Sequence, residues 1–192
     1  MKPTNLKYLV QKNRSYRRFD QNFEISEETI VELIDLARLS ASARNQQSLK
    51  YFISNSESVN KKIFPCLSWA GYLKDWDGPI EGQKPSAYII MLNDTKIATN
   101  YFCDHGIAAQ SILLGATEIE LGGCIIASVN KSILSSLLGI PKHLEILQVL
   151  ALGKPIEHVR IEEMQDDDYK YWRDQMEIHH VPKRSLEEII LK

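Results

Sequence analysis

The stretch Tyr101–Leu121, Y-F-C-D-H-G-I-A-A-Q-S-I-L-L-G-A-T-E-I-E-L, is the part of the sequence around which the fold is organised. It is long enough for about six helical turns, and its apolar residues occupy most faces of such a helix, which is typical of a buried helix. Four polar residues interrupt the apolar run: Asp104, His105, Gln110 and Ser111. The run is therefore shorter than the roughly 18 to 20 residues of a membrane span. Because glycines and alanines leave parts of its surface nearly bare, we predict a core helix that also packs at an interface.

Buried strands are predicted on both sides of this helix. Residues 87–92 form an apolar run before it, two glycines lead into a β-branched run at 123–129 after it, and 146–152 form a third apolar run. Further local signals predict helices at 5–12, after Ser26, at 58–64 and at 132–138, and a strand at 51–54.

Composition limits the class of protein. A chain of 192 residues predicts one domain, 1–192, with a polar C-terminal arm from about residue 156. The net charge of −2 gives no general reason to expect a nucleic-acid partner. The first residues lack the apolar stretch of a signal peptide. Three widely spaced cysteines without a C-x-x-C pair predict neither a disulfide framework nor a zinc site, so a reducing cytoplasm fits best.

The basic segment Asn13–Phe19, N-R-S-Y-R-R-F, is a candidate phosphate site. Arg14, Ser15 and Arg17 supply guanidinium and hydroxyl donors, which suit a dianionic group. A solvated basic turn explains the same residues, and on these residues alone it is favoured. A nucleic-acid patch is a third reading, but no further basic residues extend it into a stripe.

Small and amide side chains follow the helix that begins after Ser26. Ser42, Asn45 and Gln47 lie within six residues, and amides offer both a donor and an acceptor to the edge of a flat heterocycle. Ordinary turn chemistry, with Asn and Ser capping the backbone, is the competing interpretation.

Two later segments are less specific. Trp69–Gln83 carries large aromatics among glycines and charges, which suits either a loop over a pocket or an arm around a partner subunit. In the tail, Asp166–Asp168 lack the ligand spacing of a calcium loop, and His179-His180 is a poor metal site because adjacent side chains of a strand diverge. Lys183 and Arg184 add a second basic pair that could reach the phosphate.

No signature of a nucleophilic or acid–base enzyme is present. The chain has no G-x-G-x-x-G, no P-loop, no G-x-S-x-G and no evident Cys–His pairing, so no catalytic residue and no metal ligand are predicted. Side chains that hold a ligand rather than react with it fit a cofactor enzyme.

At this point the sequence resembles the FMN-dependent nitroreductase family across essentially its whole length. Five motifs carry the resemblance in the family's order: N-R-S-Y-R-R-F, S-A-R-N-Q-Q-S-L-K-Y-F, D-H-G-I-A-A-Q-S-I-L-L, L-G-G-C-I-I-A-S and A-L-G-K-P. The resemblance implies an α+β fold with a mixed central sheet flanked by helices, in an intertwined homodimer that binds FMN at the subunit interface. The helix at 101–121 would be the main dimer-forming helix.

The resemblance also implies a set of cofactor-binding residues. Arg14, Ser15 and Arg17 would hold the phosphate and the polar end of the flavin ring, with Arg17 near the N1 and O2 atoms. Ser42, Asn45 and Gln47, for some contacts from the other subunit, would address the ring and the ribityl chain. The remaining residues are the backbone of Ile125, Ile126 and Ala127 beside N5 and O4, and Lys183 and Arg184 at the phosphate. The chain departs from the family at Asn13, where a basic residue is usual.

The implied function is a cytoplasmic oxidoreductase. It would use NADH or NADPH to reduce a small electron-poor acceptor, a nitroaromatic or a quinone, by ping-pong hydride transfer through flavin N5. An FMN-binding protein without nitroreductase turnover, acting in flavin storage or other flavin chemistry, has the same motifs. A basic interaction module that binds polyanions is the non-enzymatic alternative.

Overall fold

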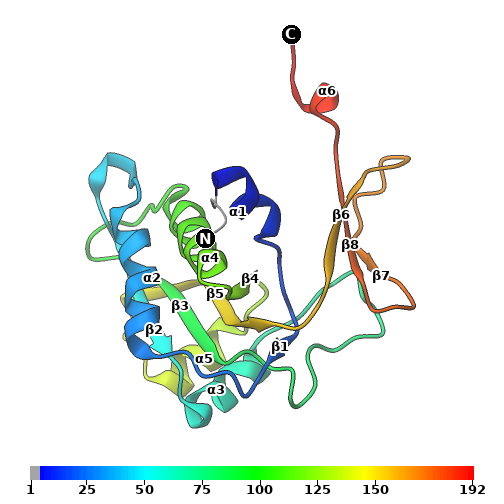
Figure 1. Ribbon diagram of the computed structural model, residues 1–192. Helices are drawn as coiled ribbons and strands as arrows, with labels where there is room; N and C mark the ends of the chain where they lie inside the picture. The colour runs from blue at the N-terminus through cyan, green and yellow to red at the C-terminus, as the bar shows by residue number, and fades with distance from the viewer. Residues whose placement is uncertain (1–4) are drawn as a thin grey trace.

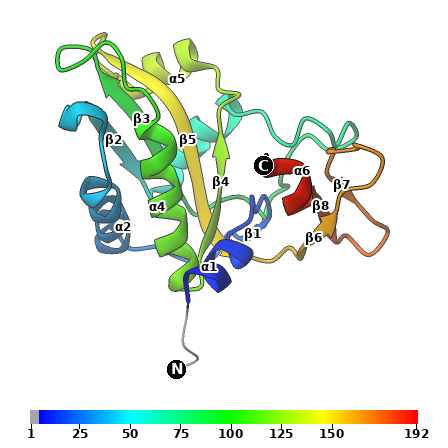
Figure 2. The same ribbon diagram turned by 90° about the horizontal axis from the view of Figure 1, so that it is seen from above.

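The computed structural model describes residues 5–192, which form an α+β fold (Figures 1 and 2). The helices are α1 (Leu6–Lys12), α2 (Glu27–Leu39), α3 (Glu57–Ile63), α4 (Asp104–Glu118), α5 (Lys131–Leu138) and α6 (Leu186–Ile189), with short 3-10 turns at Ala43–Asn45 and Phe64–Cys66. The strands are β1 (Phe19–Asp20), β2 (Leu49–Ser54), β3 (Ala87–Asp94), β4 (Gly122–Ile126), β5 (Leu144–Pro155), β6 (Val159–Glu163), β7 (Trp172–Arg173) and β8 (His179–Lys183).

The central sheet is built on the long strand β5. Along one side β5 pairs with β3, which pairs in turn with β2, and along its other side β5 pairs with β4. The last two residues of β5, Lys154 and Pro155, pair with β1. These ladders are antiparallel. Parallel pairing comes from a bridge between Ser15 and Gly123 at the sheet's edge and from the β6–β8 pair of a second, smaller sheet. The predicted α+β fold is confirmed, and its mixed pairing arises at these two places.

The central sheet has a hydrophobic core on each face, because side chains alternate along β3. Ile89 and Met91 face α2 and α4, where they pack with residues such as Ile112. Tyr88 and Ile90 face the opposite core, which α3 and α5 cover. Figure 1 shows α4 and α2 on one side of the sheet and α3 and α5 on the other.

The predicted core helix is present as α4, which begins three residues later and ends three residues earlier than the motif. Its buried residues are Asp104, Ala108, Ala109, Ile112, Leu113, Gly115, Ala116 and Thr117. One side is open to solvent, because Gly106, Ile107 and Gln110 are exposed. The helix is therefore buried on most but not all of its faces, as a core helix with an interface requires.

The polar tail forms more structure than the sequence indicates. Residues from β6 to β8 form the small sheet in the order β6-β8-β7, which stands beside the main body in Figure 1. The loop Trp69–Gln83 contains no helix or strand and reaches this sheet, where the Tyr72 amide donates to the Tyr171 hydroxyl at 3.4 Å. The chain ends beyond the sheet in α6, which projects away from the body.

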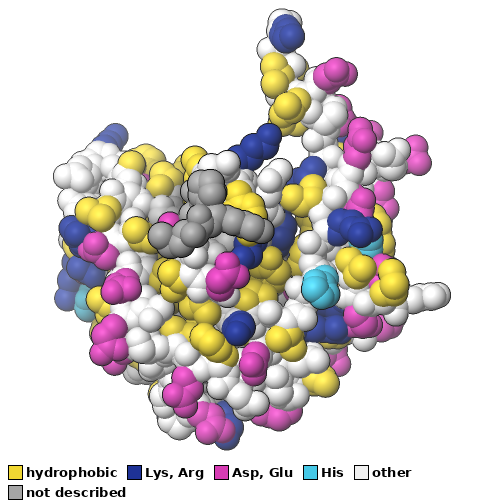
Figure 3. All heavy atoms as spheres, in the orientation of Figure 1, with side chains coloured by type: hydrophobic (Ala, Val, Ile, Leu, Met, Phe, Trp, Pro, Cys, Tyr) yellow, Lys and Arg dark blue, Asp and Glu magenta, His cyan; other side chains and the backbone are white. Residues whose placement is uncertain are grey.

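Apolar side chains remain exposed on the outer parts of this fold. Leu6 on α1, Leu39 at the end of α2, and Leu186 and Leu191 in the C-terminal arm are each more than half exposed. On the face shown in Figure 3, hydrophobic side chains gather across the middle of the molecule, and Lys and Arg side chains lie in the hollow beside the projecting arm.

Candidate functional site

The basic segment Asn13–Phe19 runs directly beside β4. Ser15 forms the parallel bridge to Gly123, and the Tyr16 amide donates to the Gly123 carbonyl at 3.0 Å. Gly122 makes this approach possible, and Gly123 allows the close packing of β4 on β5. A Cβ on Gly122 would lie 2.5 Å from a ring carbon of Tyr16, and a Cβ on Gly123 would lie 2.6 Å from the Ala151 carbonyl oxygen. The motif L-G-G-C thus allows the basic segment to reach the sheet.

Beyond Gly123, the edge of β4 that faces away from β5 is open. Among the described residues, the next backbone contact on this side is the Ser68 amide, which donates to the Ser128 carbonyl at 2.9 Å. Ile125 and Ala127 are exposed in the interval, and Ile126 is buried. The structure therefore places two predicted parts of the site next to each other. They are the backbone of 125–127, predicted to run beside the flavin, and the basic segment, predicted to bind the phosphate.

Arg17 is buried although it carries a charge. Its Nη1 donates to the Ser15 carbonyl at 3.2 Å and lies 3.1 Å from Nε2 of His179, and its guanidinium stacks on the Tyr171 ring at 4.8 Å. Its backbone amide donates to a carboxylate oxygen of Glu157 at 2.7 Å. The hydrogen bonds found within residues 5–192 use only Nη1 of the guanidinium.

Arg14 and Ser15 are consecutive residues between the end of α1 and β1. Arg14 donates from Nη2 to the Val10 carbonyl at 2.7 Å, and burial lowers the pKa of its guanidinium. Its buried Nε has no partner among the described residues. Ser15 is exposed. The exposed Ser15 is therefore open to a ligand, whereas Arg14 Nε is a buried donor without a partner.

Ser42, Asn45 and Gln47 are positioned by the N-terminal end of α4. The Ser42 hydroxyl donates to Asp104 at 2.7 Å and accepts from the Gln47 amide at 3.0 Å. The side-chain amide of Gln47 donates from Nε2 to Oδ1 of Asn45 at 3.1 Å, and both residues are exposed with positive φ. No hydrogen bond or ion pair within residues 5–192 joins this turn to the basic segment.

Lys183 and Arg184 lie at the end of β8, at the base of the projecting arm. Arg184 pairs with Asp167 at 2.6 Å and with Glu188 at 3.0 Å, and its hydrogen bonds to these carboxylates raise the pKa of the guanidinium. Lys183 is exposed. Within the described chain, Arg184 therefore contacts carboxylates of its own segment and not the basic segment.

Three residues of the small sheet and its approach belong to the surroundings of Arg17, and the sequence did not indicate them. They are Glu157, Arg173 and His179, whose side chains are buried. The only sequence signals were a histidine pair and isolated charges in a polar tail, which read as solvated residues. Their positions follow from strand pairing between distant segments, which no local pattern encodes.

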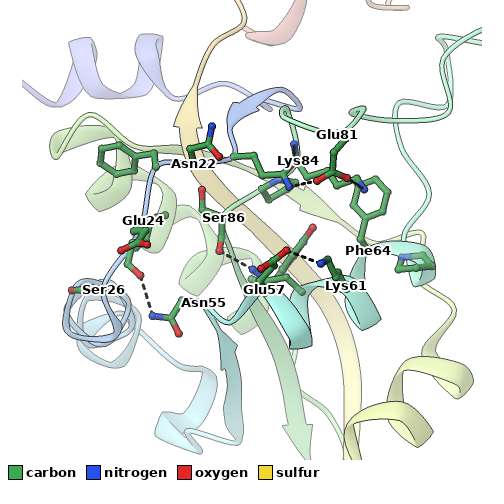
Figure 4. A pocket seen from close by; sticks show the side chains of 17 residues that line it. Asn22, Glu24, Ser26, Asn55, Glu57, Lys61, Phe64, Glu81, Lys84 and Ser86 are labelled. Carbon is green, nitrogen blue, oxygen red and sulfur yellow. Dashed lines mark hydrogen bonds and ion pairs between the residues drawn. The ribbon is translucent and has the colours of Figure 1, made fainter.

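A depression of about 970 Å³ lies elsewhere, between the β1–α2 connection, α3 and the segment 81–88 (Figure 4). None of the predicted site residues lines it. Its charges are paired with one another, Lys61 with Glu57 at 2.6 Å and Lys84 with Glu81 at 2.7 Å. It thus offers no charge to a ligand comparable with that of Arg17.

Two further properties concern the whole described chain. No group of three or more His, Cys, Asp or Glu side chains within residues 5–192 could hold a metal ion. None of the helices in this range has both the length and the apolar character that crossing a bilayer requires.

Comparison with known proteins adds three findings. Residues 82–154, from β3 to β5, match the family model described as the nitroreductase family. A protein of Methanothermobacter thermautotrophicus, provisionally named as an NADH dehydrogenase/NAD(P)H nitroreductase, is 26% identical over 83% of this chain and 82% of its own length.

Two solved structures share the fold. A protein of Exiguobacterium sibiricum, provisionally named as a nitroreductase and solved in complex with FMN, has a TM-score of 0.71 at 17% identity and covers 90% of this chain and 99% of its own. A nitroreductase family protein of Clostridium difficile has a TM-score of 0.68 at 17% identity and covers 98% of both chains. The family model, the sequence relative and the two solved structures all show similarity to nitroreductases.

Proposed function

We propose that this chain binds FMN between the basic segment and the open edge of β4, and that it uses NADH or NADPH to reduce a small electron-poor acceptor such as a nitroaromatic or a quinone. The FMN complex of the structural relative and the name of the sequence relative support this proposal. The chain would be one domain, 1–192, in the reducing cytoplasm, where its three free cysteines fit.

The observation that carries the proposal is a set of free donors beside an open strand edge. Within residues 5–192, the Arg17 Nε and Nη2 make no hydrogen bond, Arg14 has a buried Nε without a partner, and Ser15 is exposed. Guanidinium and hydroxyl groups suit a phosphate, and the backbone of Ile125 to Ala127 suits the alternating donors and acceptors of a flat ring. The residues present therefore fit FMN.

Bound FMN would supply the electron transfer, taking a hydride from the nicotinamide and passing it to the acceptor. The residues of the chain would bind, orient and stabilise. Arg17 places a fixed positive charge in a site with little water, where it favours negative charge on the ring edge that it contacts. Arg14 and Ser15 would hold the phosphate. Solvent would supply protons, so no side chain needs to act as a nucleophile.

We further propose that the working form is an intertwined homodimer. Ser42, Asn45 and Gln47 present polar groups at a surface without a contact to the basic segment of their own chain. A second copy would bring this turn to the flavin. The exposed side of α4 and the apolar residues of the arm give such a copy a surface to cover.

Steady-state kinetics test the proposal. With varied NADH or NADPH at several fixed concentrations of a nitroaromatic or quinone, we expect parallel double-reciprocal plots, because donor and acceptor would use the same flavin face in turn. Protein that binds FMN but shows no turnover with either donor would instead be a flavin-binding protein. Protein that binds no FMN would contradict the proposal.

A further inference from the structure

The guanidinium of Arg17 is held by groups that come from the other end of the chain. His179 on β8 contacts Nη1 of Arg17, and the guanidinium stacks on the Tyr171 ring. Glu157, in the connection from β5 to β6, accepts a hydrogen bond from the Arg17 backbone amide. His179 and Glu157 are separated from Arg17 by 162 and 140 residues. These contacts place Arg17 beside the small sheet and the connection that leads to it.

His179 is a neutral acceptor in this contact. Burial lowers its pKa to about 4, and the neighbouring guanidinium of Arg17 acts in the same direction. A neutral ring has one acceptor nitrogen, so Nε2 accepts from Arg17 Nη1 at 3.1 Å and the ring proton lies on Nδ1. Nδ1 is buried without a partner among the described residues. A leucine would avoid this unpaired donor, so the ring is a poor choice for stability alone.

Glu157 fixes the backbone of the same residue. Its Oε1 accepts the Arg17 amide at 2.7 Å, and its Oε2 accepts from Nη2 of Arg173 at 3.2 Å. One oxygen of this carboxylate therefore binds the Arg17 backbone amide, and the other binds the guanidinium of Arg173. Within residues 5–192, no carboxylate forms an ion pair with the Arg17 guanidinium, and its Nε and Nη2 make no hydrogen bond.

We propose that His179 and Glu157 are positioning residues for Arg17, so that the small sheet is part of the flavin site. His179 orients the guanidinium without neutralising it, and Glu157 fixes the backbone that carries it. A protonated histidine would repel Arg17, and a carboxylate in its place would cancel the charge that the ligand needs. This inference rests on the proposed function, because it assigns Arg17 to the flavin.

A matched set of variants tests the proposal. His179→Gln keeps an acceptor, through Oε1, near the position of Nε2, whereas His179→Leu removes it. His180→Gln is the control, because His180 lies on the same strand but bonds to Glu162 at 2.7 Å and Asp174 at 3.1 Å. The measurements are the thermal midpoint, the dissociation constant for FMN and the reduction potential of the bound flavin.

We expect His179→Leu to weaken FMN binding about tenfold, while His179→Gln and His180→Gln stay within about threefold of the wild type. If the reduced flavin loses ten times more affinity than the oxidised flavin, the potential of His179→Leu falls by about 30 mV. Equal affinity and potential in His179→Leu and the wild type would overturn the inference, even with a lowered thermal midpoint. Wild type that binds no FMN would overturn the proposed function and, with it, the role assigned here.

A second measurement requires neither bound flavin nor a folded His179→Leu variant. In a proton NMR titration of the histidine rings, His179 should titrate near pH 4 in the wild type, and Arg17→Met should raise its pKa. Glu157→Gln, which keeps the acceptor for the Arg17 amide, should retain the low value more closely than Glu157→Leu. A His179 pKa that is the same in the wild type and in Arg17→Met would overturn the contact itself.

Discussion

At the scale of single residues, the burial of Arg17 explains why its charge would act strongly on a ligand. Only 8% of the residue is exposed, and the closest hydrogen-bonding partner of its guanidinium is a neutral imidazole. Water screens a charge poorly in such a place, so its interaction with an anionic group is stronger than at an open surface.

The first prediction concerns this charge. Arg17→Ala should raise the dissociation constant for FMN by roughly 10- to 100-fold, the equivalent of losing about 1.5–3 kcal/mol from hydrogen bonds to a charged group, and should slow flavin reduction. Arg160→Ala, on the exposed side of β6, is the control. The measurements are fluorescence titration of FMN and stopped-flow reduction. Unchanged affinity and rate in Arg17→Ala would refute the assignment.

The second prediction concerns pH. The pKa of His179 is about 4 in the folded state and about 6.5 in the unfolded state. The unfolded state therefore binds more protons between these values, and the stability that neutral His179 contributes is complete above pH 6.5 and is lost as the pH falls toward 4. Burial is the largest cause of this lowered pKa, and the positive charges of Arg17, Arg173, His180 and Arg18 act in the same direction.

Urea denaturation of wild type and His179→Gln from pH 7 to 4.5 measures this dependence. The wild type should lose more unfolding free energy than the variant as the pH falls. Other groups cancel in the comparison, including His180, where burial acts to lower the pKa but hydrogen bonds to Asp174 and Glu162 outweigh it and raise the pKa. Parallel curves for the two proteins would show that His179 does not titrate as described.

The sequence predicted only some of the residues around Arg17. Arg14, Ser15 and Arg17 follow from donor chemistry within a short segment, and the glycines of β4 from a local turn signal. His179 and Glu157 could not be predicted, because their contacts cross more than a hundred residues and depend on how the tail folds. Their roles, like those of the other site residues, remain predictions.

At the scale of elements, local signals placed the helices of the body, and its strands other than β1, within a few residues. Ser26 caps α2 by accepting from the Thr29 amide, and Gly139 ends α5 with a left-handed φ of 63°. The small sheet was not predicted, because β7 has two residues and β6 and β8 have five each. Strands this short are defined by their partners rather than by their own pattern.

The third prediction compares two glycines on α4. A Cβ on Gly115 would overlap the side chains of Leu36 and Leu33, so Gly115→Ala should push α2 away and cost about 1–3 kcal/mol of unfolding free energy. Gly106 has nothing within 4 Å of its added Cβ, so Gly106→Ala should stabilise the single chain by about 0.5–1 kcal/mol.

Urea denaturation of both variants measures these values, first at one protein concentration and then over a range of concentrations. If Gly106→Ala instead destabilises the protein increasingly as the concentration rises, then a second copy packs against this side of α4. Equal effects of the two substitutions would contradict the packing of α2 on α4 described here.

At the scale of the whole molecule, the C-terminal arm is the part that a single chain explains least. Leu186 and Ile189 on α6 and Leu191 beyond it are 70%, 59% and 95% exposed. Exposed apolar residues that are clustered in one projecting segment mark a surface for another chain. The sequence suggested an arm, and the resemblance suggested the second copy that would receive it.

The fourth prediction tests this surface. Leu186→Ser combined with Ile189→Ser should weaken self-association at least about a hundredfold, because each buried aliphatic side chain contributes about 1.5–3 kcal/mol. Ile133→Ser, on α5 on the other side of the sheet, is the control for removal of an exposed aliphatic group. Sedimentation velocity over a range of concentrations gives the comparison. A double variant that sediments like the wild type would exclude the arm from the interface.

The absorbance spectrum of the purified protein, before and after anaerobic addition of NADH and of NADPH, tests the central claim most directly. We predict the bands of an oxidised flavin, either as isolated or after reconstitution with FMN, and their bleaching by at least one donor. Bands that persist with both donors would contradict the reductase function. Protein that stays colourless in excess FMN would contradict the flavin site.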